Sequence, residues 1–282
     1  MISFSRLQMG WILIGCGMAV SIADDAATTP TPTDGEKQSR ARELLEHMQA
    51  MTMEKVVGNG RQPVELIDRA LLTYSDPVRA NVHGTVWAWG REGRPLALVE
   101  VFQPTSGTQW VHAITLTSTD RVVATVSERQ TWSPSTTGIQ FQAIPSAAQP
   151  AERDVARLGQ LKDFARKFDA HEFWDPDNSR YELRLLVQPI HRYRDPEHKT
   201  IDGAVFLLAH GTNPEVVLLI EAQGETVASS EWRYGLVRLG SAELHVELDG
   251  KEVWHEPRTP GVSGKPTDPY WLFFTEQKSV KK

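Results

Sequence analysis

The sequence is poor in cysteine, in basic residues and in long apolar runs. Of its 282 residues only Cys16 is a cysteine, which excludes an intrachain disulfide and leaves the hydrophobic core to stabilise the fold. The net charge is −6, so the chain lacks the basic excess that is typical of nucleic-acid binding. No apolar run reaches the roughly 20 residues of a membrane-spanning helix. We therefore expect neither a nucleic-acid partner nor a membrane span.

Sequence motifs of common enzyme classes are also missing. We find no Gly-rich phosphate loop, no Gly-x-Gly-x-x-Gly turn after a strand and no Gly-x-Ser-x-Gly elbow. Residues 171–175 have Asp where a zinc-protease helix has its second His, which favours the polar end of a helix. Residues 175–179 begin like a calcium loop but lack its later Gly and Glu, which favours a turn. We expect no catalytic residue, no cofactor and no metal site.

The first 23 residues have the pattern of a secretory signal peptide. A start with one positive charge, Arg6, precedes an apolar run at residues 9–22, and the small residues Ser21 and Ala23 stand before Asp24. We therefore expect cleavage after Ala23 and export to the periplasm or the extracellular space.

Cys16 provides an alternative to that cleavage. It ends a Leu-Ile-Gly-Cys segment that is similar to the lipobox of bacterial lipoproteins, in which the cysteine is lipidated. The apolar run continues past Cys16 to Ile22, which favours cleavage after Ala23. Contact with a membrane is expected only if Cys16 carries a lipid.

The remaining sequence predicts a β-rich α+β protein of two tandem modules, each with one N-terminal helix and about five mostly antiparallel strands. The predicted order is a signal peptide at 1–23, a flexible spacer at 24–35, a first module at 36–132, a linker at 133–150, a second module at 151–256 and a C-terminal extension at 257–282. Within the extension, the apolar residues 270–274 are expected to pack back onto the body.

Apolar spacing places the elements inside each module. It predicts a helix over residues 37–55, and a second helix that begins at Pro150 and has an apolar stripe reaching Phe168. Pro189 is expected to end its strand or to confine it to a sheet edge. The predicted strands are 64–74, 82–90, 95–102, 110–116, 122–126, 180–188, 232–239 and 244–248. Since the central hairpins are apolar on both faces, either two sheets pack face to face or a curved sheet encloses an apolar cavity.

Two parts of the sequence resemble each other. At an offset of 119, residues 74–103 match 193–222 at six identical positions, and beyond the hairpin the offset becomes 122. The matched residues include Tyr, Asp-Pro and Gly, and at the second offset Trp110 faces Trp232 and Trp132 faces Trp254. We interpret this pattern as an internal duplication. Because the shared residues are those of turns and cores, the repeat predicts a scaffold.

Two groups of residues are candidates for a functional site. One group, predicted to bind a ligand, consists of strand tryptophans and two residues at the start of the second hairpin: Trp87, Trp89, Trp110, Trp232, Tyr193 and Asp195. The other is an acid–base or metal cluster of His191, Asp195 and His198. The first copy has Leu72 and Arg79 at the positions of the two histidines, so this cluster would be confined to the second copy.

The Tyr-x-Asp-Pro start, the apolar hairpin and the Trp-ended strands of residues 181–254 resemble a group of exported bacterial proteins of unknown function. This resemblance implies no activity. At the level of fold, the chain also resembles periplasmic lipoprotein carriers of the LolA type, which implies a curved antiparallel sheet around a lipid pocket.

From these features we expect an exported, non-enzymatic binding or scaffold protein with an unknown protein partner or apolar ligand. One alternative is a periplasmic carrier of lipid or of another apolar ligand. The other is a hydrolase-like enzyme with a site near His191, Asp195 and His198.

Overall fold

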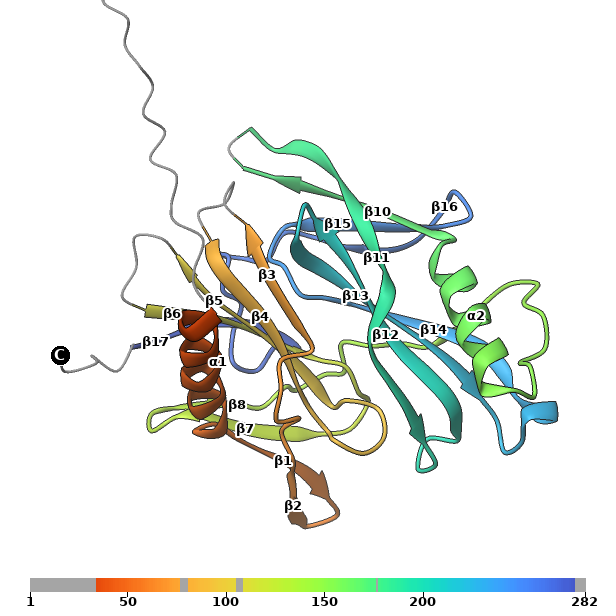
Figure 1. The fold of residues 1–282 in the computed structure, drawn as a ribbon, viewed down its shortest axis with the longest axis horizontal. Coiled ribbons are helices and arrows are strands. Elements are labelled where there is room, and N and C mark those ends of the chain that lie inside the picture. Colours follow the sequence, from red (N-terminus) through yellow and green to blue (C-terminus); the bar gives the residue numbers. More distant parts are fainter. Residues whose placement is uncertain (1–33, 77–80, 105–108, 176, 277–282) are drawn as a thin grey trace, which may run out of the picture. The chain divides into compact units, whose positions relative to one another are not determined.

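The computed structural model describes residues 34–76, 81–104, 109–175 and 177–276 (Figure 1). It contains the helices α1 (Asp34–Gln49) and α2 (Asp154–Ala165), the short 3-10 helix η1 (Val227–Ser229) and three antiparallel sheets. This content confirms the β-rich α+β class. Neither described helix has the length and apolar character needed to cross a membrane. The predicted signal peptide and Cys16 lie outside the described residues.

The chain divides into two units after Arg40, and the sheets belong to the second unit. The five-stranded sheet has the order β17-β6-β5-β4-β3. Its strands are β3 (Leu72–Asp76), β4 (Asn81–Trp89), β5 (Ala97–Pro104), β6 (Gln109–Leu116) and β17 (Tyr270–Glu276). The pairing of β17 with β6 confirms that the C-terminal apolar segment packs back onto the body.

The eight-stranded sheet has the order β16-β15-β10-β11-β12-β13-β14-β9. Its strands are β9 (Gln142–Ala143), β10 (Phe168–Trp174), β11 (Ser179–Asp195), β12 (Thr200–His210), β13 (Asn213–Gln223), β14 (Glu231–Arg238), β15 (Glu243–Leu248) and β16 (Lys251–Glu256). The alternating burial along β15 confirms the predicted half-buried strand at 244–248. Figure 1 shows α2 close to the strands of this sheet.

The four-stranded sheet has the order β2-β1-β7-β8. Its strands are β1 (Thr52–Val57), β2 (Gly60–Val64), β7 (Val122–Ser127) and β8 (Gln130–Trp132). The prediction of a helix over residues 37–55 was therefore wrong at its C-terminal end. Residues from Thr52 onward form strand β1 because they pair with β2 on one side and with β7 on the other.

Three further predictions need correction. Phe168 and residues 171–174 belong to strand β10, which pairs with β11 and β15, and not to the helix that we expected there, and Asp175 follows β10 in a turn. The predicted strand 64–74 is interrupted, because β2 ends at Val64 and β3 begins at Leu72. The second helix, α2, begins at Asp154 and not at Pro150.

Pro189 does not end its strand, because β11 continues through it to Asp195. The strand does lie at a local sheet edge there, as predicted, since β10 pairs only with residues 179–183 of β11. Its pairing with β12 shifts register between Leu186 and His191. Because the ladder is irregular there, a proline without an N–H group is tolerated.

The apolar residues form three buried clusters. One lies between α1, the five-stranded sheet and the four-stranded sheet, and includes Met48 and Trp132. A second lies between α2 and the eight-stranded sheet, and includes Leu161. The third cluster contains Val86 of β4 and Val205 of β12, so it draws on both large sheets. The second apolar face of each hairpin is therefore covered by the other sheet.

Candidate functional site

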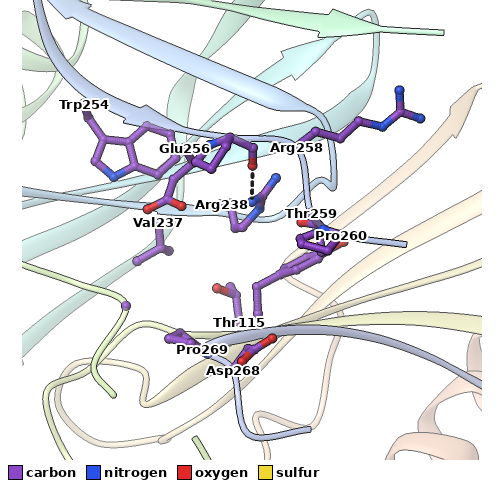
Figure 2. Close-up of a pocket in the computed structure, with 13 residues that line it drawn as sticks. Thr115, Val237, Arg238, Trp254, Glu256, Arg258, Thr259, Pro260, Asp268 and Pro269 are labelled. Atoms are coloured by element: carbon purple, nitrogen blue, oxygen red, sulfur yellow. Dashed lines mark hydrogen bonds between the residues drawn. The ribbon is translucent and has the colours of Figure 1, made fainter. Parts of the chain in front are cut away.

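A cleft with a volume of about 230 Å³ lies at the ends of β14 and β16. Its apolar lining residues are Val237, Trp254, Pro257, Pro260, Pro269 and Tyr270. Figure 2 shows Trp254 and Glu256 on one side of this cleft, with Thr115 of β6 and Asp268 on the other. Concave sites with apolar walls and a few convergent polar groups are typical of small-molecule binding. We call this the Arg238 cleft, after its central cation.

The Arg238 guanidinium is held by backbone carbonyl groups. Its Nε donates to the Gly240 carbonyl at 2.9 Å, Nη1 to Pro257 at 2.9 Å and Nη2 to Ala242 at 2.6 Å. The guanidinium carbon also lies 5.2 Å from the ring centroid of Tyr270. A guanidinium has five N–H donors, so each terminal nitrogen retains one N–H for another acceptor. The Arg238 side chain is thus held in place while two of its N–H groups remain able to donate a hydrogen bond.

The positive charge of Arg238 has no ion-pair partner among the described residues. Figure 2 shows the Glu256 carboxylate directed away from the guanidinium, although both groups line the cleft. Burial lowers the pKa of Arg238, and the nearby Glu256 and Glu215 side chains only partly oppose that shift. A buried cation gains stability from a desolvated anion at hydrogen-bond distance. The cleft therefore favours an anionic group.

Arg258 lines the same cleft but is already neutralised. Its Nη1 and Nη2 lie 3.0 and 2.6 Å from the two carboxylate oxygens of Asp175. Its guanidinium carbon also lies 4.4 Å from the ring centroid of Trp174. Arg258 is consequently a matched control for Arg238, because it has the same chemistry with its charge paired.

A second cleft, of about 420 Å³, contains charged side chains from separate segments, and we call it the charged cleft. The His198 Nδ1 lies 2.8 Å from the Asp195 Oδ2, and the His198 Nε2 lies 3.5 Å from the Asp120 Oδ2. The Lys55 Nζ lies 2.6 Å from the Glu197 Oε1. These charges neutralise one another. The described lining residues include no serine, threonine, tyrosine or cysteine that the His198 imidazole could activate.

Asp195, one of the predicted site residues, lies in this charged cleft. Its carboxylate accepts hydrogen bonds from the backbone N–H of Arg94 at 3.0 Å and of His198 at 3.2 Å. Burial disfavours the charged form, but these bonds and the His198 side chain outweigh it and lower the pKa of Asp195. The carboxylate therefore remains charged and holds the chain turn after β11.

Tyr193 is part of a buried network and not of either cleft lining. Its hydroxyl donates to the Glu221 Oε1 at 2.7 Å, and Arg94 binds both Glu221 oxygens at 2.6 and 2.8 Å. Burial, followed by the adjacent Glu221 carboxylate, raises the pKa of Tyr193 well above its usual range. The phenol thus acts as a neutral hydrogen-bond donor.

His191 is not brought into the charged cleft with Asp195 and His198. Its ring stacks near Tyr193 at a centroid distance of 5.9 Å, and its Nε2 has no hydrogen-bond partner among the described residues. Burial and the charge of Arg69 lower the pKa of His191. Of the predicted acid–base cluster, the structure joins only Asp195 and His198.

The four predicted tryptophans lie in the core. Trp87, Trp89 and Trp110 belong to the cluster beneath α1, and Trp232 belongs to the cluster beneath α2. None is more than 3% exposed, and none lines the two clefts described above.

Sequence reasoning missed Arg238 and Trp254 as cleft residues. Arg238 follows the buried residues Leu236 and Val237 at the end of β14, so a cation enters an apolar region there. An arginine directly after apolar strand residues was the sequence feature that could have indicated the cleft. The partner segments come from β16 and β6, and their proximity depends on the tertiary fold.

Comparisons of the chain with protein-family models, with curated proteins and with solved structures find no match. The function proposed below therefore rests on the geometry of the site and on the sequence.

Proposed function

We propose that the protein is an exported, non-enzymatic binding scaffold whose Arg238 cleft takes a small ligand with an anionic group on an apolar body. The observation that carries this proposal is the half-buried Arg238 charge, which lies beside apolar walls and is held by backbone carbonyl groups and the Tyr270 ring, with no ion-pair partner among the described residues. Export and cleavage after Ala23 rest on the sequence of residues 1–23.

The scaffold in this proposal consists of two duplicated modules, and the order of elements supports the duplication. In the first half, α1 precedes β1 to β8, with β1 paired to β2 and β7, and β7 paired to β8. In the second half, α2 precedes β10 to β16, with β10 paired to β11 and β15, and β15 paired to β16. The long β11 takes the places of both β2 and β3.

Strand register supports the same proposal. Val86 lies opposite Glu100 in the β4–β5 pair, and Val205 lies opposite Leu219 in the β12–β13 pair. Both positions are related by the offset of 119 found in the sequence. Because a one-residue slip would turn every side chain to the other face, the same register in both pairs favours a common origin.

The size of the Arg238 cleft limits the ligand. Its volume of about 230 Å³ lies below the roughly 300 Å³ at which pockets for drug-sized ligands begin. The cleft therefore fits a small carboxylic acid, or the terminal carboxylate of a larger partner. Arg recognises carboxylates because its planar fork matches their two oxygens.

We favour this function over a lipid carrier for a structural reason. The carrier hypothesis depended on hairpin faces without an apolar partner. Val86 and Ala88 of β4 instead form a buried cluster with Val205 and Leu207 of β12. The apolar surface that motivated a lipid pocket is therefore accounted for by packing between sheets.

The proposal predicts that binding depends on the ligand's negative charge and on Arg238. We expect aromatic and aliphatic monocarboxylates to raise the melting temperature of the mature protein, and their matched primary amides to leave it unchanged. Arg238→Gln should remove the difference between acid and amide, whereas Arg258→Gln should preserve it. Thermal shift together with intrinsic tryptophan fluorescence measures both effects. The proposal fails if no acid in the panel is preferred to its amide, or if both variants lose the preference equally.

A further inference from the structure

Three histidine rings form a row across β10, β15 and β16. His171 of β10 lies opposite His245 of β15, and His245 lies opposite His255 of β16. The ring centroids are 4.7 Å apart in the first pair and 4.4 Å apart in the second, and both pairs are stacked. Neutral imidazole is the commonest protein ligand of transition metals. The row therefore concentrates metal-ligating groups on one sheet face.

A carboxylate completes a set of three ligand atoms. The Glu243 Oε1 lies 3.2 Å from the His245 Nε2 and 3.7 Å from the His255 Nε2, and all three atoms lie within 4.8 Å of one another. Ligands bound tetrahedrally at about 2.0–2.1 Å from one Zn²⁺ ion are about 3.3 Å apart. The observed separations are thus close to those that a single ion requires.

The orientation of His245 also suits a ligand. Its Nδ1 lies 2.8 Å from the Glu252 Oε2, so the carboxylate holds the ring by the nitrogen that faces away from Glu243. A carboxylate bound to the second nitrogen fixes the tautomer and strengthens the ligand in known zinc sites. His171, which is only 7% exposed, supports the opposite side of the ring with an interplanar angle of 2°.

We propose that Glu243, His245 and His255 bind a divalent transition-metal ion of the Zn²⁺ type. The Glu243 and His255 side chains are 38% and 43% exposed, so an ion can enter from solvent and retain water in its fourth position. Three protein ligands with one open position are typical of reactive zinc sites, while structural sites are usually closed by four.

No local sequence pattern indicates this site, because its ligands come from two strands of a hairpin. Glu243 and His245 are two residues apart on β15 and share a face, and His255 joins them only through the β15–β16 pairing. At the offset of 122, Arg121, just before β7, and Val123 of β7 stand in place of Glu243 and His245. The related hairpin β7–β8 lacks this ligand set.

The test is calorimetric titration of Zn²⁺ into chelator-treated protein without a histidine tag. We expect one ion per chain, a higher melting temperature with Zn²⁺, and the visible absorption of tetrahedral Co²⁺ when Co²⁺ replaces it. Glu252→Gln should weaken binding about 10–100-fold, because it removes only the group that orients His245. His245→Ala and His255→Ala should abolish saturable binding.

His191→Gln is the matched control, because it removes a histidine from β11, a strand that carries none of the proposed ligands. Circular dichroism of each variant without metal verifies that its fold is retained, and the exposed Glu243→Gln serves if a histidine variant unfolds. The proposal is overturned by the absence of saturable binding to the parent protein. It is equally overturned if His191→Gln weakens binding as much as His245→Ala does.

Discussion

The two large sheets are joined by two tyrosine-centred contacts that differ in charge. In one, the Tyr193 hydroxyl donates to Glu221, and Arg94, from the loop before β5, binds the same carboxylate. In the other, the Tyr74 hydroxyl contacts Glu100 and lies 2.7 Å from the Asn213 Oδ1 at the start of β13. Each contact thus combines a tyrosine and a glutamate of one sheet with a polar side chain from the other half of the chain.

The third members of the two contacts occupy equivalent positions. Arg94 and Asn213 are 119 residues apart, as are Tyr74 and Tyr193. The two contacts therefore share the positions of the tyrosine and of its partner from the other half of the chain. They differ in charge, because one contact contains a buried ion pair and the other a neutral amide. The glutamates are the exception, because Glu100 corresponds to Leu219, two residues before Glu221 and on the same strand face. The two contacts therefore share the tyrosine and its partner position but place their glutamates at different positions.

The largest predicted effect comes from breaking the charged contact. Arg94→Met should destabilise the fold by about 3–5 kcal/mol, because it leaves Glu221 buried without its counter-ion. Asn213→Ala should cost about 1–3 kcal/mol, since it removes hydrogen bonds to Tyr74 and Glu215 but breaks no ion pair. Urea unfolding of both variants measures the difference. Equal losses would show that charge does not distinguish the two contacts.

The second prediction tests the packing of each tyrosine ring against a glycine, which the two contacts have in common. A Cβ added to Gly84 would lie 2.0 Å from the Tyr74 Cζ, and one added to Gly203 would lie 2.6 Å from the Tyr193 Cε2. Gly84→Ala and Gly203→Ala should each destabilise the fold by about 1–3 kcal/mol, because the tyrosine ring must shift. Gly159→Ala in α2 is the control, since nothing lies within 4 Å of its new Cβ. We expect that variant to be stabilised by roughly 0.5–1 kcal/mol in thermal unfolding. Tolerance of alanine at Gly84 would contradict the tight packing.

Sequence patterns predicted the strands better than the helices and the site. Residues 244–248 were placed correctly because their alternation follows directly from one buried face. Met51 misled us, since it is buried and stands at helical spacing after Met48, although α1 ends at Gln49 and β1 begins at Thr52. Pairing with β7 places the residues after Met51 in a strand. Arg238 depends on carbonyl groups from three separate loop positions, which no local pattern encodes.

The smallest predicted effect concerns one position at which the two halves carry different titratable residues and should respond differently to low pH. His112 of β6 and Tyr234 of β14 are related by the offset of 122, and both are buried. Burial, assisted by the neighbouring His47, lowers the pKa of His112 well below its usual range, while burial raises the pKa of Tyr234. Of these two residues, only His112 therefore binds more protons in the unfolded chain than in the folded chain at acidic pH.

The sign of the resulting pH dependence follows from that proton excess. Below the unfolded pKa of about 6.5, the free energy of unfolding should fall as the pH falls, by up to about 1.4 kcal/mol per pH unit from His112. Urea unfolding between neutral pH and pH 5 measures the slope. His112→Gln should reduce it, since the variant has no titrating group at this position, and Tyr234→Phe should leave it unchanged. An unaltered slope in His112→Gln would assign the acid sensitivity to another group, such as His171 or His191, whose pKa values burial also lowers.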